Sequence, residues 1–170
     1  MQFVAIVDKF SEGLWSFHVI VPKEIVNALT QDGKKRVMCS IGNHEAFHAG
    51  FMPDGKGNDF IKLNKERMIS FGLEVGMEVK VTLEKDISKY GMAMPEEFAE
   101  VLETDEVGAG FFEQLTAGKK RSLIYAVSMV KNSDGRITKA LIILDHLIAN
   151  GGKLDFRELN EAFKLKNRKF

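Results

Sequence analysis

The stretch Val19-Ile20-Val21-Pro22-Lys23-Glu24-Ile25-Val26 opens a pattern that returns 42 positions later as Ile61-Lys62-Leu63-Asn64-Lys65-Glu66-Arg67-Met68. In both copies an extended apolar run precedes a residue suited to a helix start, a Lys-Glu pair and a short amphipathic helix. A glycine-containing turn and a further strand complete each copy, with strand residues 36–39 in the first and 78–81 in the second. Because one copy alone has too little apolar surface to fold, we expect the two to pair and close a small β-barrel without open edges.

Alternation of apolar and polar residues predicts the other strands of this part. We expect strands over residues 3–10, 15–21, 36–41, 46–52, 60–63 and 78–83, and short helices over 23–29 and 64–71.

After residues 86–91 the apolar period changes from two to about 3.6, which is typical of helices. Pro95 begins a first helix, and others follow over residues 107–115 and 119–130. A helix capped by Ser133-Asp134 ends at Asn150-Gly151-Gly152, and Asp155 caps a last one. The sequence therefore predicts an α+β protein, with a β-barrel domain over residues 1–86 and a helical bundle over 92–170.

The charges are balanced. The chain has 24 basic and 24 acidic residues, and its two parts divided at Tyr90 have 12 of each. A module that binds nucleic acid through phosphates carries a basic excess, so a nucleic-acid partner is not expected. One cysteine, Cys39, and the absence of a signal peptide or a long apolar stretch favour a cytoplasmic protein that does not enter a membrane. Barrel closure within one chain favours a monomer.

The segment His44-Glu45-Ala46-Phe47-His48 matches the zinc-protease pattern H-E-x-x-H. That motif requires a helix, which places both imidazoles on one face near a single zinc ion. Here the segment follows a Gly42-Asn43 turn and runs into a strand, where four residues separate the histidines by roughly 13 Å. We therefore predict no metal site, and hairpin histidines instead.

No other constellation predicts catalysis or a cofactor. Cys39 lies in an alternating run and is expected to be a buried structural residue. Short basic clusters around Arg36 and at Lys119-Lys120-Arg121 either meet an anion or form solvated faces. Trp15 either stacks on a ligand or packs in the barrel. Candidate binding residues are thus Trp15, Arg36, His44, His48, Lys119 and Arg121.

Several motifs carry a resemblance to known families. Ile20-Val21-Pro22-Lys23-Glu24, Leu63-Asn64-Lys65 and residues 76–83 resemble a bacterial and archaeal domain family of unknown function, which is similar in fold to AbrB/MazE-type double-split barrels. Pro95-Glu96-Glu97-Phe98, residues 118–125 and residues 136–140 resemble the YdeI/OmpD-associated helical family, which is labelled with bacteriocin protection. The resemblance implies a fusion of the two domains in this order and brings no established catalytic residues.

Three functions follow as hypotheses. The favoured one is a non-enzymatic binding or stress-related module that recognises a small molecule or a protein partner. The second is a DNA-binding regulator, by analogy of fold with AbrB alone. The third is a small-molecule enzyme with a site between barrel and bundle, in which His18, His44, His48 or His146 acts as acid or base.

Overall fold

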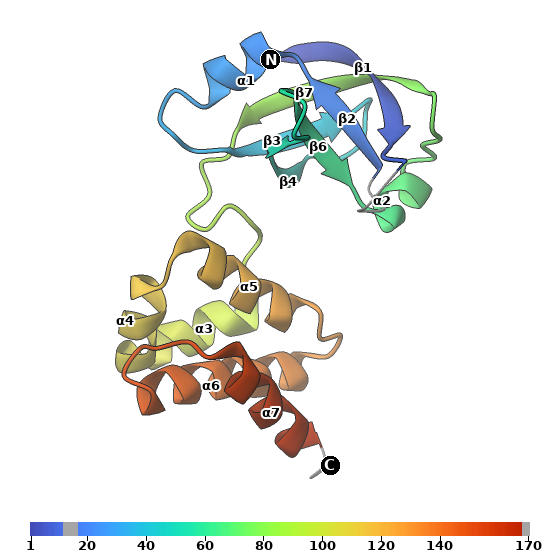
Figure 1. Ribbon diagram of the computed structural model, residues 1–170. Coiled ribbons are helices and arrows are strands. Elements are labelled where there is room, and N and C mark those ends of the chain that lie inside the picture. The colour runs from blue at the N-terminus through green and yellow to red at the C-terminus, as the bar shows by residue number, and fades with distance from the viewer. Residues whose placement is uncertain (12–16, 168–170) are drawn as a thin grey trace. The chain divides into compact units, whose positions relative to one another are not determined.

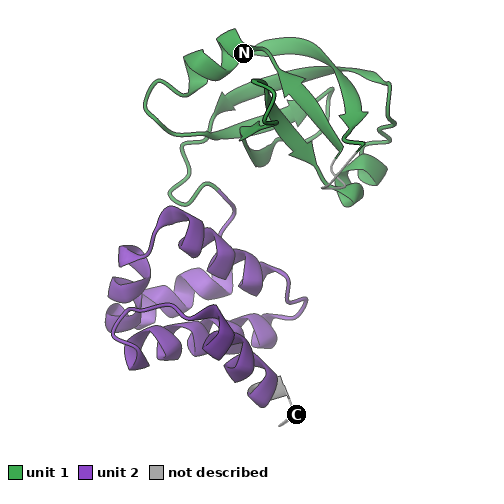
Figure 2. Ribbon diagram, viewed as in Figure 1, with its two compact units in different colours: residues 1–91 green, residues 92–170 purple. Residues whose placement is uncertain are grey.

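The computed structural model describes residues 1–11 and 17–167, and it divides into two units, residues 1–91 and 92–170 (Figure 2). The first unit is a nearly closed antiparallel barrel and the second is helical, so the predicted α+β class is confirmed. Trp15 and the start of the expected strand over 15–21 lie outside the described residues.

Within the described residues, seven strands form the barrel in the order β4-β3-β7-β1-β2-β6-β5, and neighbours pair antiparallel (Figure 1). This order has two ends, so the expectation of a barrel without open edges is wrong: in the part of the chain that the structure describes, β4 and β5 each pair on one side only. Their bounds are β1 Gln2–Lys9, β2 Phe17–Val21, β3 Arg36–Ile41, β4 Phe47–Gly50, β5 Met52–Pro53, β6 Asp59–Leu63 and β7 Glu78–Lys85.

The strand expected over residues 46–52 is divided at Phe51. Before this residue β4 pairs with β3, and after it β5 pairs with β6. The Phe51 amide donates to the Lys35 carbonyl oxygen at 3.0 Å, and its ring is buried. The chain thus changes its pairing partner at a buried corner, which alternation along the sequence cannot reveal.

Strand register shows how the two sequence copies combine. The pairs β2–β6 and β3–β7 each join equivalent strands of the two copies. Val19 pairs with Ile61 and Ser40 with Thr82, and both pairs join residues 42 positions apart, which is the spacing of the repeat. The copies are therefore related by an approximate two-fold axis. The helices α1 (Lys23–Leu29) and α2 (Lys65–Ser70) lie at opposite ends of the barrel (Figure 1).

Inward-facing apolar side chains fill the barrel. Val7, Val19, Val37, Ile61 and Val81 have no exposed surface. Met68 of α2 and Leu29 of α1 pack against the same cluster. Each half contributes to one continuous core, because the alternating side chains of paired strands point to the same side.

The second unit, as described up to residue 167, contains five helices: α3 Glu96–Thr104, α4 Glu106–Gln114, α5 Ala117–Ser128, α6 Ser133–Ala149 and α7 Phe156–Asn167. The helix α6 is central, since α3, α4, α5 and α7 all contact it. Phe98 and Phe112 are fully buried against each other in an edge-to-face pair, with ring centroids 5.3 Å apart. None of the described helices is long and apolar enough to cross a bilayer.

Most helix starts agree with the sequence. The Asn64 side chain accepts from the Arg67 amide at 2.8 Å, and the Asp155 carboxylate accepts from the amides of Arg157 and Glu158. One expected cap is wrong. The α6 helix is capped by Asn132, which accepts from the Gly135 amide, while Ser133 is already the first helical residue. Asn and Ser are equally suited to this position, so local sequence does not distinguish them.

Candidate functional site

The histidines of the H-E-x-x-H segment lie in different surroundings. His44 lies in the turn before β4 and stacks on Phe71, with ring centroids 4.2 Å apart, whereas His48 lies on β4. The prediction that the segment is not helical is confirmed. Within residues 1–11 and 17–167, no three histidine, cysteine or acidic side chains gather in a way that could hold a metal ion.

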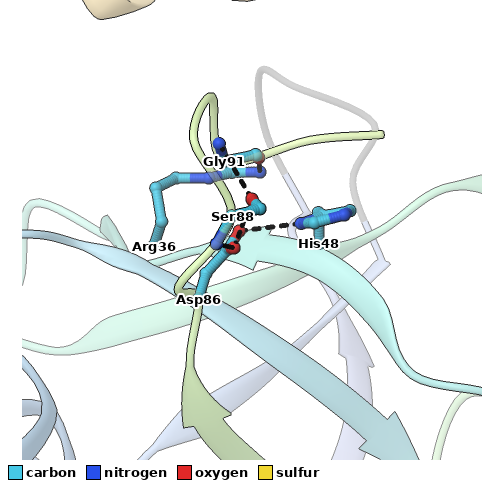
Figure 3. Close-up of polar contacts among 5 residues, drawn as sticks. All are labelled: Arg36, His48, Asp86, Ser88 and Gly91. Carbon is cyan, nitrogen blue, oxygen red and sulfur yellow. Dashed lines mark hydrogen bonds and ion pairs between the residues drawn. The ribbon is translucent and has the colours of Figure 1, made fainter. Parts of the chain in front are cut away.

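A polar network joins His48 to the end of β7 (Figure 3). The Asp86 side chain is fully buried and accepts from His48 Nδ1 at 2.7 Å. Its other oxygen accepts from Ser88 Oγ at 2.5 Å and from the Ser88 amide at 2.9 Å. The Ser88 hydroxyl accepts in turn from the Gly91 amide at 3.1 Å. Asp86 is therefore the centre of the network.

These contacts keep Asp86 ionised. Burial opposes the charged form, but the hydrogen bonds from Ser88 and His48 outweigh it and lower the pKa of Asp86 below its ordinary value of 3.8. Because the ionised carboxylate only accepts, Nδ1 of His48 carries the proton of this bond. Ser88 bonds to the carboxylate and not to an imidazole nitrogen, so the network lacks a base-activated serine nucleophile.

Arg36 completes the network on its other side. Its guanidinium donates to the Gly91 carbonyl oxygen at 2.6 Å (Figure 3). Gly91 has φ +72°, and a side chain there would begin about 3.2 Å from Arg36. The arrangement holds residues 86–91 against β3 and β4. We interpret this network as a structural anchor for the start of the segment that follows the barrel.

A second site is a cleft of about 320 Å³ between α2 and the turn before β4. Its lining includes Glu45, Phe47, Asn64, Glu66, Arg67 and Phe71. The carbon at the centre of the Arg67 guanidinium lies 3.6 Å from the centroid of the Phe47 ring, within cation–π range. Phe47 is buried and belongs to the barrel core, so it fixes the position of the guanidinium.

Arg67 is half-buried, and no carboxylate lies in ion-pair contact with its guanidinium among the described residues. Burial lowers the pKa of Arg67, and the neighbouring charge of Glu66 only partly opposes this effect. Among the described residues Arg67 forms no ion pair, and its backbone amide, not its guanidinium, bonds to Asn64. A guanidinium remains protonated in proteins, so this cleft presents a fixed positive charge with free hydrogen-bonding capacity.

Cys39 lies beneath the Arg67 cleft, and its thiol is unreactive. It is fully buried, as predicted, and burial raises the pKa of its thiol to about 12, despite the opposing charge of Arg67. The thiol is therefore protonated near neutral pH and does not act as a nucleophile.

The six predicted binding residues do not form one site. His44 borders the Arg67 cleft, since it stacks on the lining residue Phe71, and Arg36 and His48 belong to the Asp86 network. Lys119 and Arg121 lie in the second unit, in the first turns of α5, and line neither site. Trp15 lies outside the described residues.

The remaining two histidines are engaged in packing. His18 is buried and stacks on Phe10, with ring centroids 3.8 Å apart. His146 is buried in α6, and its Nε2 accepts from the Asp155 amide at 3.2 Å. That bond links the end of α6 to the start of α7 and occupies one ring nitrogen.

Sequence reasoning missed Asp86, Phe47 and Arg67 as site residues. For Arg67 a signal exists in the repeat, because the equivalent residue 42 positions earlier is Ile25, which packs against the barrel core. A charged residue at a position that the other copy uses for packing indicates a role other than core filling. No comparable signal marks Asp86.

Two family models match the chain. Residues 3–83 match a family described as a domain of unknown function, DUF1905, and residues 92–150 match the family described as bacteriocin-protection, YdeI or OmpD-associated. No curated protein and no solved structure matches it, and the expected relation to AbrB/MazE-type barrels stays a prediction. The chain thus matches a DUF1905 model followed by a YdeI/OmpD-associated model, the pairing and order that its sequence motifs predict.

Proposed function

We propose that the barrel is a non-enzymatic binding module, and that its Arg67 cleft receives an anionic group of a small ligand. The observation that carries this proposal is the half-buried guanidinium, which forms no ion pair among the described residues and lines a cleft of about 320 Å³. Such a volume lies within the range of small-molecule sites, about 300–1,000 Å³.

The electrostatics of Arg67 support this reading. Removing a charge from water without a partner costs free energy, and proteins usually compensate with an ion pair or hydrogen bonds. Phe47 compensates in part through its ring face, but it provides no hydrogen-bond acceptor. A carboxylate or phosphate oxygen accepts from a guanidinium in a two-pronged geometry, so an anionic ligand would supply what the cleft lacks.

The chemistry of the described residues favours binding over catalysis. Ser88 bonds to Asp86, the Cys39 thiol is held protonated, and no described serine or cysteine is bonded to a histidine. The family description of the second domain, bacteriocin protection, supports placing the binding step in a stress response.

Titration of the full chain with inorganic phosphate and with benzoate tests the proposal, with the side-chain Nε–H resonance of Arg67 as the readout. We expect binding that weakens at least tenfold in Arg67→Met, because this variant keeps the apolar stem and removes the charge.

Lys65→Met is the matched control, since Lys65 is exposed on the same helix and the variant loses the same charge. Equal weakening in both variants would indicate a general charge effect. If no ligand that carries a carboxylate or phosphate group binds in a way that depends on Arg67, the proposed function is contradicted.

A further inference from the structure

Two glutamates share the cleft with Arg67. Glu45 comes from the turn before β4 and Glu66 from α2, and both residues line the same cleft. Neither forms an ion pair or an accepting hydrogen bond among the described residues. The cleft therefore presents one positive and two negative groups, all three with free capacity for a ligand.

We propose that the ligand of this cleft is a free amino acid with an apolar side chain, held by its carboxylate at Arg67 and by its ammonium group at Glu45 and Glu66. This inference rests on the proposed function and specifies its ligand class.

Charge complementarity distinguishes a zwitterion from a simple anion. An anion at Arg67 gains one attraction but approaches two carboxylates, and the repulsion between like charges disfavours its binding. An ammonium group on the same ligand converts this repulsion into attraction. Since Glu45 and Glu66 come from different elements, they can meet an ammonium from two sides.

Size and lining point to a single amino acid. The volume of about 320 Å³ lies at the lower end of the range for small-molecule sites. Phe47 and Phe71 contribute apolar wall, and the ring face of each is already engaged, by Arg67 and by His44 respectively. The half-buried Phe71 can contact an aliphatic or aromatic side chain beside its stack on His44.

The test uses the full chain and three probes, L-phenylalanine, its N-acetyl derivative and its amide, measured by titration calorimetry near neutral pH. We expect phenylalanine to bind most tightly. The N-acetyl derivative lacks the ammonium and the amide lacks the carboxylate, so each should bind at least tenfold more weakly than phenylalanine.

Substitution of the glutamates separates the contributions. In Glu45→Gln/Glu66→Gln we expect phenylalanine to bind at least tenfold more weakly, while the N-acetyl derivative binds more tightly than it does to the unaltered chain. Glu74→Gln/Glu78→Gln is the matched control, because these exposed barrel glutamates lie outside the cleft and the charge change is the same.

The outcomes distinguish the two proposals. If the N-acetyl derivative binds as tightly as phenylalanine, and Arg67→Met abolishes both, the cleft binds anions without requiring an ammonium, and only the zwitterion inference fails. If phosphate or benzoate binds through Arg67 but phenylalanine does not, the same inference fails. If no probe binds in a way that depends on Arg67, both proposals are overturned.

Discussion

At the scale of single residues, the two faces of β4 support two charged side chains, those of Asp86 and Arg67. The side chain of His48 faces outward from β4 to Asp86, while that of Phe47, its neighbour, faces inward and supports Arg67. Alternation along the strand sends these neighbours to opposite faces. One four-residue strand therefore supports both the anchor network and the proposed ligand cleft.

We expect Asp86→Asn to lower the free energy of unfolding of the first unit by about 1–3 kcal/mol, because it removes a buried charged acceptor of three hydrogen bonds. Urea unfolding followed by the fluorescence of Trp15, the single tryptophan, measures this change. Glu84→Gln, at an exposed position near the end of β7 and two residues before Asp86, should have an effect within about 0.5 kcal/mol. Equal effects of both variants would show that Asp86 does not anchor the network.

The pH dependence of stability follows from the same carboxylate. Because the pKa of Asp86 is lower in the folded state than its ordinary value of 3.8, ionised Asp86 stabilises the fold above that value. This contribution is lost as the pH falls through the folded-state pKa. The stability difference between the unaltered chain and Asp86→Asn should therefore be constant from about pH 7 to pH 5 and shrink below pH 4. A difference that stays constant to pH 2 would contradict the assignment.

At the scale of elements, helix packing in the second unit depends on a close approach at Gly108 of α4. A Cβ atom at this position would lie 2.8 Å from the Cβ of Leu144 on α6 and 2.7 Å from a carboxylate oxygen of Asp105. Gly110 lies on the same helix with open space around its Cβ position. The two glycines therefore have different physical roles, although they are two residues apart.

We expect Gly108→Ala to destabilise the second unit by about 1–3 kcal/mol, since the added methyl group forces α4 away from α6. Gly110→Ala should stabilise it by about 0.5–1 kcal/mol, because alanine favours the helix. Thermal unfolding followed by the helical circular dichroism signal tests both. A stabilising effect of Gly108→Ala would show that the helices adjust without cost.

At the scale of the whole molecule, charge balance is the property with the clearest functional consequence. The 24 basic and 24 acidic residues give a formal net charge of zero, and each part of the chain divided at Tyr90 is itself balanced. Affinity for nucleic acid at low salt comes largely from phosphate contacts, and this chain has no basic excess to supply them.

We therefore expect no retardation of a random-sequence DNA duplex by micromolar protein at low salt. Electrophoretic mobility measures this directly, with a basic DNA-binding protein as positive control. Retardation that disappears as salt rises would support the DNA-binding alternative and contradict the prediction.

Local patterns in the sequence determine the helices and strands of this protein. Period-two and period-3.6 spacing, Asn64 and Asp155 as caps, and the repeat of 42 positions all depend on residues close together in the chain, so the sequence alone determines them. The break at Phe51 and the open pair of barrel edges were not predictable in this way, because each depends on which distant strand a segment pairs with.

Both candidate sites were decided by tertiary structure. Asp86 meets His48 across 38 positions, and the cleft joins a turn and a helix from separate parts of the chain. The sequence shows Arg67 where its repeat has Ile25, which marks the residue but not the Phe47 ring beneath it. Side chains far apart in sequence meet only after strand register and helix packing have placed them, and those depend on the free energy of the whole core, not on any local pattern.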